Sequence, residues 1–300
     1  MTTVPGRRSS TFTRLLRHGF TDPSAAERLL GLDALASVRS DSVLLEALGA
    51  TADPDLALRS LVRLVEAGTD DADERRMLLG TLVTAKPLRD RLLGVLGASE
   101  ALGDHLARHP RDWKALATYE ATDLHPGVAE FERELADAVD PDSLRIAYRR
   151  CLLAIAARDV SGTIDVAETA AELADLATAT LRAALAIARA AAPADAALCR
   201  LAVIAMGKCG GHELNYVSDV DVIFVAEPAD GVEEGKAVPA ATRLAAHMMR
   251  ICSDTTVEGT IWPVDANLRP RGATARSCGP SPPTSRTTSA GPRPGSSRRS

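Results

Sequence analysis

The chain has 300 residues, a formal net charge of −5 and 46% apolar residues, whereas only 3% of its residues are aromatic. The acidic balance argues against a nucleic-acid-binding groove, and no apolar run is long enough for a membrane-spanning helix. Because alanine and leucine supply most of the apolar residues, the composition favours close-packed helices.

The cysteines and the N-terminal residues indicate a cytoplasmic protein. Five cysteines without paired spacing are typical of reduced thiols. Residues 1–22 are polar and basic and contain no apolar stretch of the kind found in signal peptides. We expect these residues to form a mobile N-terminus.

Residues 23–192 are predicted to form a helical region. The clearest helix begins at Asp53–Pro54, an N-cap followed by proline at the first helical position, and Gly68 ends it. A second helix is expected to open at Ser143, and a third to run from Val166 to Arg189.

Residues 193–270 are predicted to form a catalytic core that contains strands. An apolar run from Leu201 to Met206 predicts the first strand, and a glycine-rich turn follows it. Gly207, Gly210 and Gly211 permit backbone angles and close approaches that a Cβ forbids. The N–H groups of this turn, beside Lys208, are suited to phosphate.

Two aspartates lie in the next predicted strand, from Ser218 to Val225. Strand side chains alternate between faces, so Asp219 and Asp221 project from the same face. Carboxylates this close repel each other unless a cation lies between them, and hard oxygen ligands suit Mg²⁺. The pattern indicates nucleotidyl or phosphoryl transfer. The alternative is an exposed face of an edge strand, which the nearby glycine turn makes less favoured.

A polar loop over 226–237, a helix over 238–252 and a strand over 260–265 complete the predicted core. Pro263 indicates that the last strand lies at an edge or contains a bulge. Asp265 ends this strand, and its alternative interpretation is a surface aspartate.

The motif from Gly207 to Phe224, G-K-x-G-G-x-E-L-N-Y-x-S-D-x-D-x-I-F, resembles the nucleotidyltransferase superfamily. The match is closer to one family, the bifunctional glutamine synthetase adenylyltransferase/deadenylylase. Ile155–Asp159, Glu258–Gly259 and Leu268–Pro270 resemble further segments of that family. The resemblance implies an α+β fold, in which a helical N-terminal region precedes a polymerase-β-like mixed sheet with flanking helices.

The resemblance also implies a metal-dependent nucleotidyltransferase. One copy of the motif, preceded by about two hundred residues, resembles the N-terminal half, which removes AMP from glutamine synthetase by phosphorolysis and releases ADP. Glutamine synthetase is then the protein substrate, and a nitrogen-signalling regulatory protein is a further candidate partner. The implied catalytic and Mg²⁺-binding residues are Asp219, Asp221 and Asp265. Nucleotide or phosphate contacts are expected at Lys208, Gly210, Gly211, Ser218 and Arg269.

Two other interpretations stay open. The chain is an inactive truncated fragment that acts at most as a helical protein-binding module, or it is a nucleotidyltransferase for another protein substrate. Uridylyltransferases of the nitrogen-signalling protein share the G-G and D-x-D elements but lack E-L-N-Y-x-S-D. Cys209, in the glycine turn, is not expected to act as a nucleophile.

Residues 271–300 differ from everything before them. They are rich in Ser, Arg, Pro and Gly and contain no Leu, Ile, Val or aromatic residue, a composition typical of disorder. The resemblance stops at Arg271–Gly272, and we interpret the tail as the product of a frameshift or a truncated gene. The alternative is a native basic tail that binds nucleic acid or a membrane surface.

Overall fold

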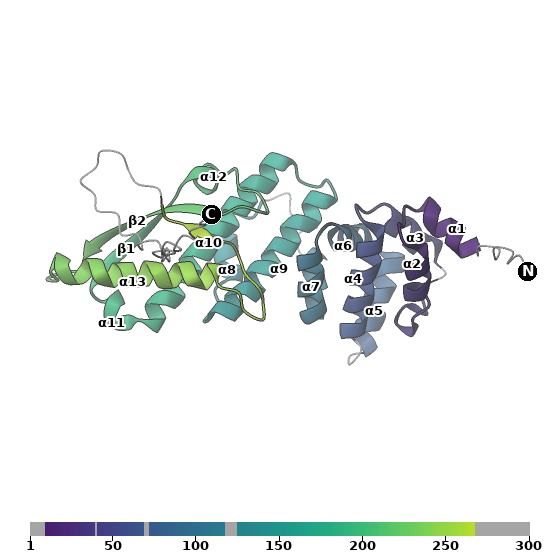
Figure 1. The fold of residues 1–300 in the computed structure, drawn as a ribbon, viewed down its shortest axis with the longest axis horizontal. Helices are drawn as coiled ribbons and strands as arrows, with labels where there is room; N and C mark the ends of the chain where they lie inside the picture. Colours follow the sequence, from purple (N-terminus) through teal and green to yellow (C-terminus); the bar gives the residue numbers. More distant parts are fainter. Residues whose placement is uncertain (1–9, 40, 69–71, 118–124, 268–300) are drawn as a thin grey trace, which may run out of the picture.

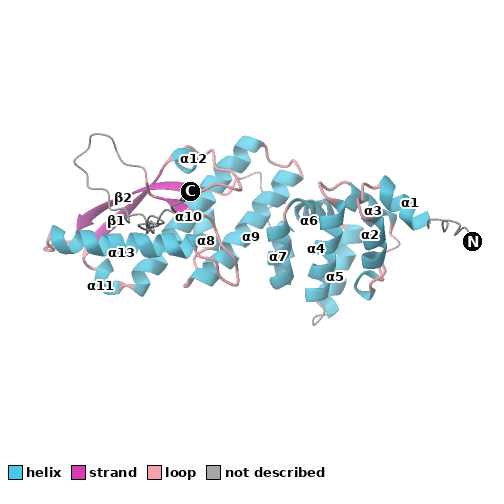
Figure 2. Cartoon of the chain, in the orientation of Figure 1, coloured by secondary structure: helices cyan, strands magenta, loops and turns pink. Residues whose placement is uncertain are grey.

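The computed structural model describes residues 10–39, 41–68, 72–117 and 125–267. The molecule is elongated, with helices along its whole length (Figure 1). Figure 2 shows that the strands gather at one end, beside the long helix α13 (Glu234–Ser253). This arrangement confirms the α+β class, because a helical part precedes a small mixed sheet.

The first part of the described chain, called here the helical body, packs around one apolar cluster of leucines, valines and alanines. Its elements are α1 (Ser10–Arg17), α2 (Pro23–Leu30), η1 (Asp33–Leu35), α3 (Ser42–Gly49), α4 (Pro54–Ala67), α5 (Ala72–Thr84), α6 (Lys86–Ala98), α7 (Glu100–Arg108) and η2 (Pro110–Ala117). Helix α4 confirms the predicted start, because the Asp53 side chain accepts a hydrogen bond from the Leu56 N–H at 2.8 Å. Gly68 ends the helix, as predicted.

The N-terminal residues differ from the expected mobile segment. From Ser10 onward the chain forms α1, and the side chains of Leu15 and Phe20 are buried in the cluster. Asp22 then caps α2 by accepting a hydrogen bond from the Ala25 N–H. Leu15 and Phe20 lie among polar and basic residues, so the composition of the segment did not predict that they would be buried.

The second part of the described chain contains the sheet and the helices that cover it. Its elements are α8 (Val128–Glu134), α9 (Pro141–Val160), α10 (Val166–Ala191), α11 (Pro193–Ala196), β1 (Cys199–Ala205), α12 (Gly207–Gly210), β2 (Val220–Pro228), α13 and β3 (Val264–Asp265). Helix α10 begins at Val166, as predicted. Helix α9 begins before the predicted Ser143, because Asp140 is the N-cap and Ser143 bonds back to it in a capping box.

The sheet has the order β1-β2-β3, with β1 antiparallel and β3 parallel to β2. One face of β2 is apolar, since the side chains of Val220, Val222 and Phe224 are buried in a cluster shared with α10 and α13. Helix α13 starts earlier than predicted and contains Pro239. Strand β3 is shorter than the predicted 260–265, because only its last two residues pair with β2.

Helix α9 joins the two parts of the molecule. Leu153 and Ala157 belong to the cluster of the helical body, whereas Tyr148 and Ile155 belong to the cluster around the sheet. The division into 23–192 and 193–270 stays a prediction, and the tail from 271 lies outside the described residues. None of the helices in the described ranges is long and apolar enough to cross a membrane.

Candidate functional site

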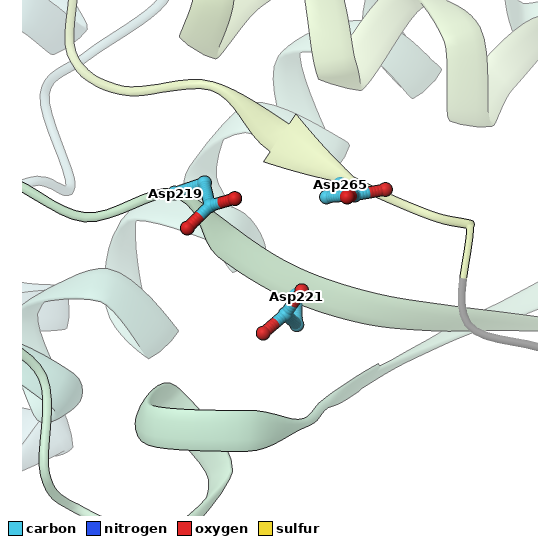
Figure 3. Close-up of side chains that lie close together, drawn as sticks. All are labelled: Asp219, Asp221 and Asp265. Carbon is cyan, nitrogen blue, oxygen red and sulfur yellow. The ribbon is translucent and has the colours of Figure 1, made fainter.

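Three aspartates converge where β2 meets β3 (Figure 3). Asp219 directly precedes β2, Asp221 lies in it, and Asp265 ends β3. The parallel register places Asp221 opposite Asp265. One carboxylate oxygen from each of the three side chains lies within 4.8 Å of the others. The structure therefore brings together the three acids that the sequence singled out.

The surroundings of this trio suit a cation. Asp219 is exposed and the other two are half-buried, and no Lys or Arg in the described part of the chain forms an ion pair with any of them. Within the described ranges, Asp265 Oδ1 is the one carboxylate oxygen of the trio that accepts hydrogen bonds, from the N–H and Nδ2 groups of Asn267 at 2.8 and 2.6 Å. Three unpaired negative charges repel one another. A donor set made only of carboxylate oxygens fits a hard divalent ion such as Mg²⁺.

Gly207 is the glycine that touches the acidic site. It has a positive φ of 53°, and a Cβ there would lie 2.5 Å from Asp221 Oδ2. The preceding N–H, of Met206, donates to the Asp221 carbonyl at 2.8 Å. The turn and the strand are thus in direct contact. The sequence singled out Gly207, with Gly210 and Gly211, as a position that allows a close approach, but Gly207 was not among the predicted phosphate contacts.

Gly210 and Gly211 act differently from the sequence-based expectation. Their N–H groups donate within the turn, to the carbonyls of Met206 and Gly207, both at 3.0 Å. They are therefore not free to bind phosphate. Gly210 is needed for packing, because a Cβ there would lie 2.5 Å from the Ala205 carbonyl oxygen.

The other predicted phosphate contacts lie around the turn or beyond the described residues. Lys208 is exposed on α12. Ser218 Oγ donates to the carbonyl of Asp219 at 2.9 Å, next to the acidic trio. Arg269 lies outside the described residues.

The loop between the glycine turn and β2 is anchored on two helices. Tyr216 Oη donates to Asp159 of α9 at 2.8 Å. Burial and this hydrogen bond raise the pKa of Tyr216 above its ordinary value. His212 has a positive φ of 56°, and its Nδ1 lies 3.5 Å from Asp175 of α10. Sequence reasoning missed Tyr216, since its partner is 57 residues away.

Cys209 is buried beneath the turn, where its Sγ lies 4.0 Å from the carbonyl oxygen of Ala174. Burial raises the pKa of this thiol, which lowers the share of reactive thiolate. These observations agree with a packing role.

Comparison with known proteins gives a consistent result. The profile of the family described as Glutamate-ammonia ligase adenylyltransferase matches residues 89–280. A protein of Streptomyces avermitilis is 81% identical over 270 residues, which cover 90% of this chain and 27% of the relative. A Mycobacterium avium protein is 43% identical over 287 residues, with the same shares covered.

A third relative, from Cutibacterium acnes, is 47% identical over 238 residues, which cover 73% of this chain and 23% of the relative. All three carry the name bifunctional glutamine synthetase adenylyltransferase/adenylyl-removing enzyme. The chain spans about a quarter of the length of these relatives. By its profile match and its high identity to these proteins, the chain belongs to the glutamate-ammonia ligase adenylyltransferase family.

Proposed function

We propose that the chain removes AMP from adenylylated glutamine synthetase by phosphorolysis, with Asp219, Asp221 and Asp265 holding Mg²⁺. The observation that carries this proposal is the convergence of three carboxylates without a cationic partner among the described residues. The names of the relatives include both adenylyl transfer and adenylyl removal. The removing reaction is favoured because the chain resembles the N-terminal half of the family, with one motif after a long helical region.

In the proposed reaction, an oxygen of inorganic phosphate forms a bond to the phosphorus of the AMP group. The bond between that phosphorus and the tyrosine oxygen breaks, ADP leaves, and the tyrosine oxygen takes up a proton. Mg²⁺, when bound, would neutralise negative charge on the phosphate oxygens.

The residues of this chain have separate parts in the proposal. The three aspartates hold the cation, and Gly207 leaves the space that the Asp221 carboxylate needs. Lys208 and Ser218 are the proposed phosphate contacts, together with Arg269. The hydrogen bond between Tyr216 and Asp159 holds the loop that leads into β2.

We also propose that the chain works in the cytoplasm. Among the described residues, the thiols of Cys151, Cys199, Cys209 and Cys252 are buried and form no disulfide, which agrees with a reducing compartment.

The test is to incubate adenylylated glutamine synthetase with the chain, phosphate and Mg²⁺ and to separate the nucleotides by chromatography. ADP is expected, and its formation should stop when EDTA removes the metal. Asp230→Asn is a matched control, because Asp230 is an exposed aspartate of the same unit that pairs with Arg200. Release of free AMP, or no reaction while the chain is folded, would contradict the proposal.

A further inference from the structure

The segment between α13 and β3, residues 254–263 and called here the connector, decides where Asp265 lies. Strand β3 pairs with β2 through only two residues in the described chain. A slip of one residue would turn the Asp265 side chain to the opposite face of the sheet. Two paired residues are a weak determinant of register, so the connector has to fix it.

The connector contains a tight turn. Thr256 and Gly259 exchange backbone hydrogen bonds at 3.1 and 2.9 Å, and Gly259 has a positive φ of 81°. Beyond this turn, the Ile261 N–H donates to the Cys252 carbonyl at 3.1 Å, and the Pro263 carbonyl accepts from the Val220 N–H at 3.0 Å. The chain then enters β3 directly.

Two arginines of α9 bind this turn. Arg145 is fully buried and donates to the carbonyls of Gly259 and Asp254, at 2.8 and 2.5 Å. Arg149, one helical turn later, donates to the carbonyls of Glu258 and Thr260, the latter at 2.9 Å. Four connector carbonyls are thus held by charge-assisted hydrogen bonds, which are stronger than neutral ones.

Arg149 also lies against the turn itself. A Cβ on Gly259 would lie 2.7 Å from Arg149 Nη2, so the guanidinium occupies the space that a side chain would need. On its other side the turn is tied to α7, because Glu258 accepts hydrogen bonds from Arg108 Nε at 3.3 Å and His109 Nε2 at 3.0 Å. The connector is therefore fixed by helices outside the sheet.

We infer that Arg149 is a positioning residue for Asp265: it sets the register of β3 and so places the third carboxylate in the acidic site. This inference rests on the proposed metal site. Arg149 does not belong to that site itself, and it acts through the four residues of backbone between Thr260 and Asp265. Arg145 also holds the connector, but it is completely buried, so its substitution would disturb the fold as well as the connector.

The test measures Mn²⁺ binding to the chain alone, by the EPR signal of free Mn²⁺, without nucleotide or glutamine synthetase. Arg149→Met should weaken Mn²⁺ binding about tenfold or more, the range found when residues that orient metal ligands are lost. Arg149→Lys keeps the positive charge but makes fewer hydrogen bonds, so its loss of Mn²⁺ affinity should be intermediate. Arg150→Met is the matched control, because Arg150 pairs with Asp112 and does not touch the connector. Its Mn²⁺ affinity should stay at the wild-type value.

The decisive comparison repeats Arg149→Met in an Asp265→Asn background. If Arg149 acts through Asp265, the substitution should then change Mn²⁺ affinity less than about twofold. Gly259→Ala strains the turn and collides with Arg149, so it should also weaken Mn²⁺ binding in the wild-type background and have little effect in the Asp265→Asn background. It replaces Arg149→Met in this comparison if Arg149→Met does not fold. Circular dichroism and thermal unfolding check the fold of each variant.

Equal Mn²⁺ affinity of the wild type and a folded Arg149→Met variant would overturn this inference and leave the proposed function standing. An equally large loss in the Asp265→Asn background would also overturn it. Absence of Mn²⁺ binding by the wild type would overturn both proposals.

Discussion

The carboxylates of the helical body and those at the edge of the sheet lie in opposite surroundings. Asp55, in α4, accepts hydrogen bonds from the N–H and Oγ1 groups of Thr21, both at 2.7 Å. Glu74, in α5, accepts from Trp113 Nε1 and Lys114 Nζ at 3.1 and 2.8 Å. The three aspartates at the sheet have no cationic partner among the described residues.

The carboxylates of the helical body have partners and stabilise the fold, whereas the aspartates at the edge of the sheet are available to a ligand. A buried acid with its hydrogen bonds satisfied stabilises its surroundings, and its removal leaves donors unpaired. A cluster of unpaired acids is unfavourable by itself and is retained where a cation compensates it. The four predictions below test this contrast, from the largest expected effect to the smallest.

The double substitution Asp219→Asn and Asp221→Asn should lower the rate of AMP removal at least about a hundredfold, because it removes two of the charges that hold the cation. Asparagine has the same shape, so the fold should be kept. The readout is ADP release per folded molecule. Asp55→Asn is the control from the helical body, and its rate per folded molecule should match that of the wild type. Retained phosphorolysis in the double variant would refute the assignment.

Mg²⁺ should stabilise the wild-type chain against unfolding by about 2.7 kcal/mol at a concentration of one hundred times its Kd, because the metal binds only the folded state. Asp265→Asn should abolish most of this gain, and Asp55→Asn should not. Thermal unfolding with and without Mg²⁺ measures the effect. The same gain in the Asp265→Asn variant would show that the ion binds elsewhere.

Without metal, Asp55→Ala should lower the free energy of unfolding by about 2–3 kcal/mol, because it leaves the Thr21 N–H and hydroxyl groups without their charged acceptor. Asp221→Asn should leave stability unchanged or raise it, because it relieves repulsion. Urea denaturation of both variants in EDTA tests this pair. A loss of stability in Asp221→Asn as large as in Asp55→Ala would remove the contrast between the two regions.

Glu258, at the contact between α7 and the connector, should give a small pH-dependent effect. Burial opposes its ionisation, but the hydrogen bond from His109 and the charge of Arg108 outweigh it and hold its pKa below the ordinary value of 4.5. Ionised Glu258 therefore stabilises the folded chain fully above pH 4.5, and this contribution is lost as the pH falls through the lower, folded-state pKa.

Glu258→Gln should accordingly cost about 1 kcal/mol at pH 7, and the difference from the wild type should shrink below pH 4.5. Unfolding curves at several pH values measure it. A difference that grows towards acid pH would contradict the stabilising role of the ionised form.

The sequence predicted those features that depend on short-range spacing. The cap of α4 at Asp53 and the start of α10 at Val166 follow from neighbouring residues, and both are observed. Asp219 and Asp221 were found through strand alternation. Asp265 was found through resemblance, and the structure brings it to the other two.

The features that the sequence did not reveal depend on contacts between distant residues. Arg149 contacts carbonyls 109 and 111 residues further along the chain. No spacing rule predicts such pairs, because they arise only when α9 packs beside the connector. The inward hydrogen bonds of Gly210 and Gly211 were missed for another reason: a glycine-rich turn read from sequence does not show which N–H groups the turn itself consumes.

The most direct test of the central claim is an anomalous-difference map from crystals of the chain soaked in MnCl₂. We predict a peak between Asp219, Asp221 and Asp265, within coordinating distance of all three carboxylates, which disappears in crystals of Asp265→Asn. A map without a peak at this edge of the sheet, or with manganese bound at other carboxylates instead, would contradict the claim that these unpaired acids hold a divalent cation.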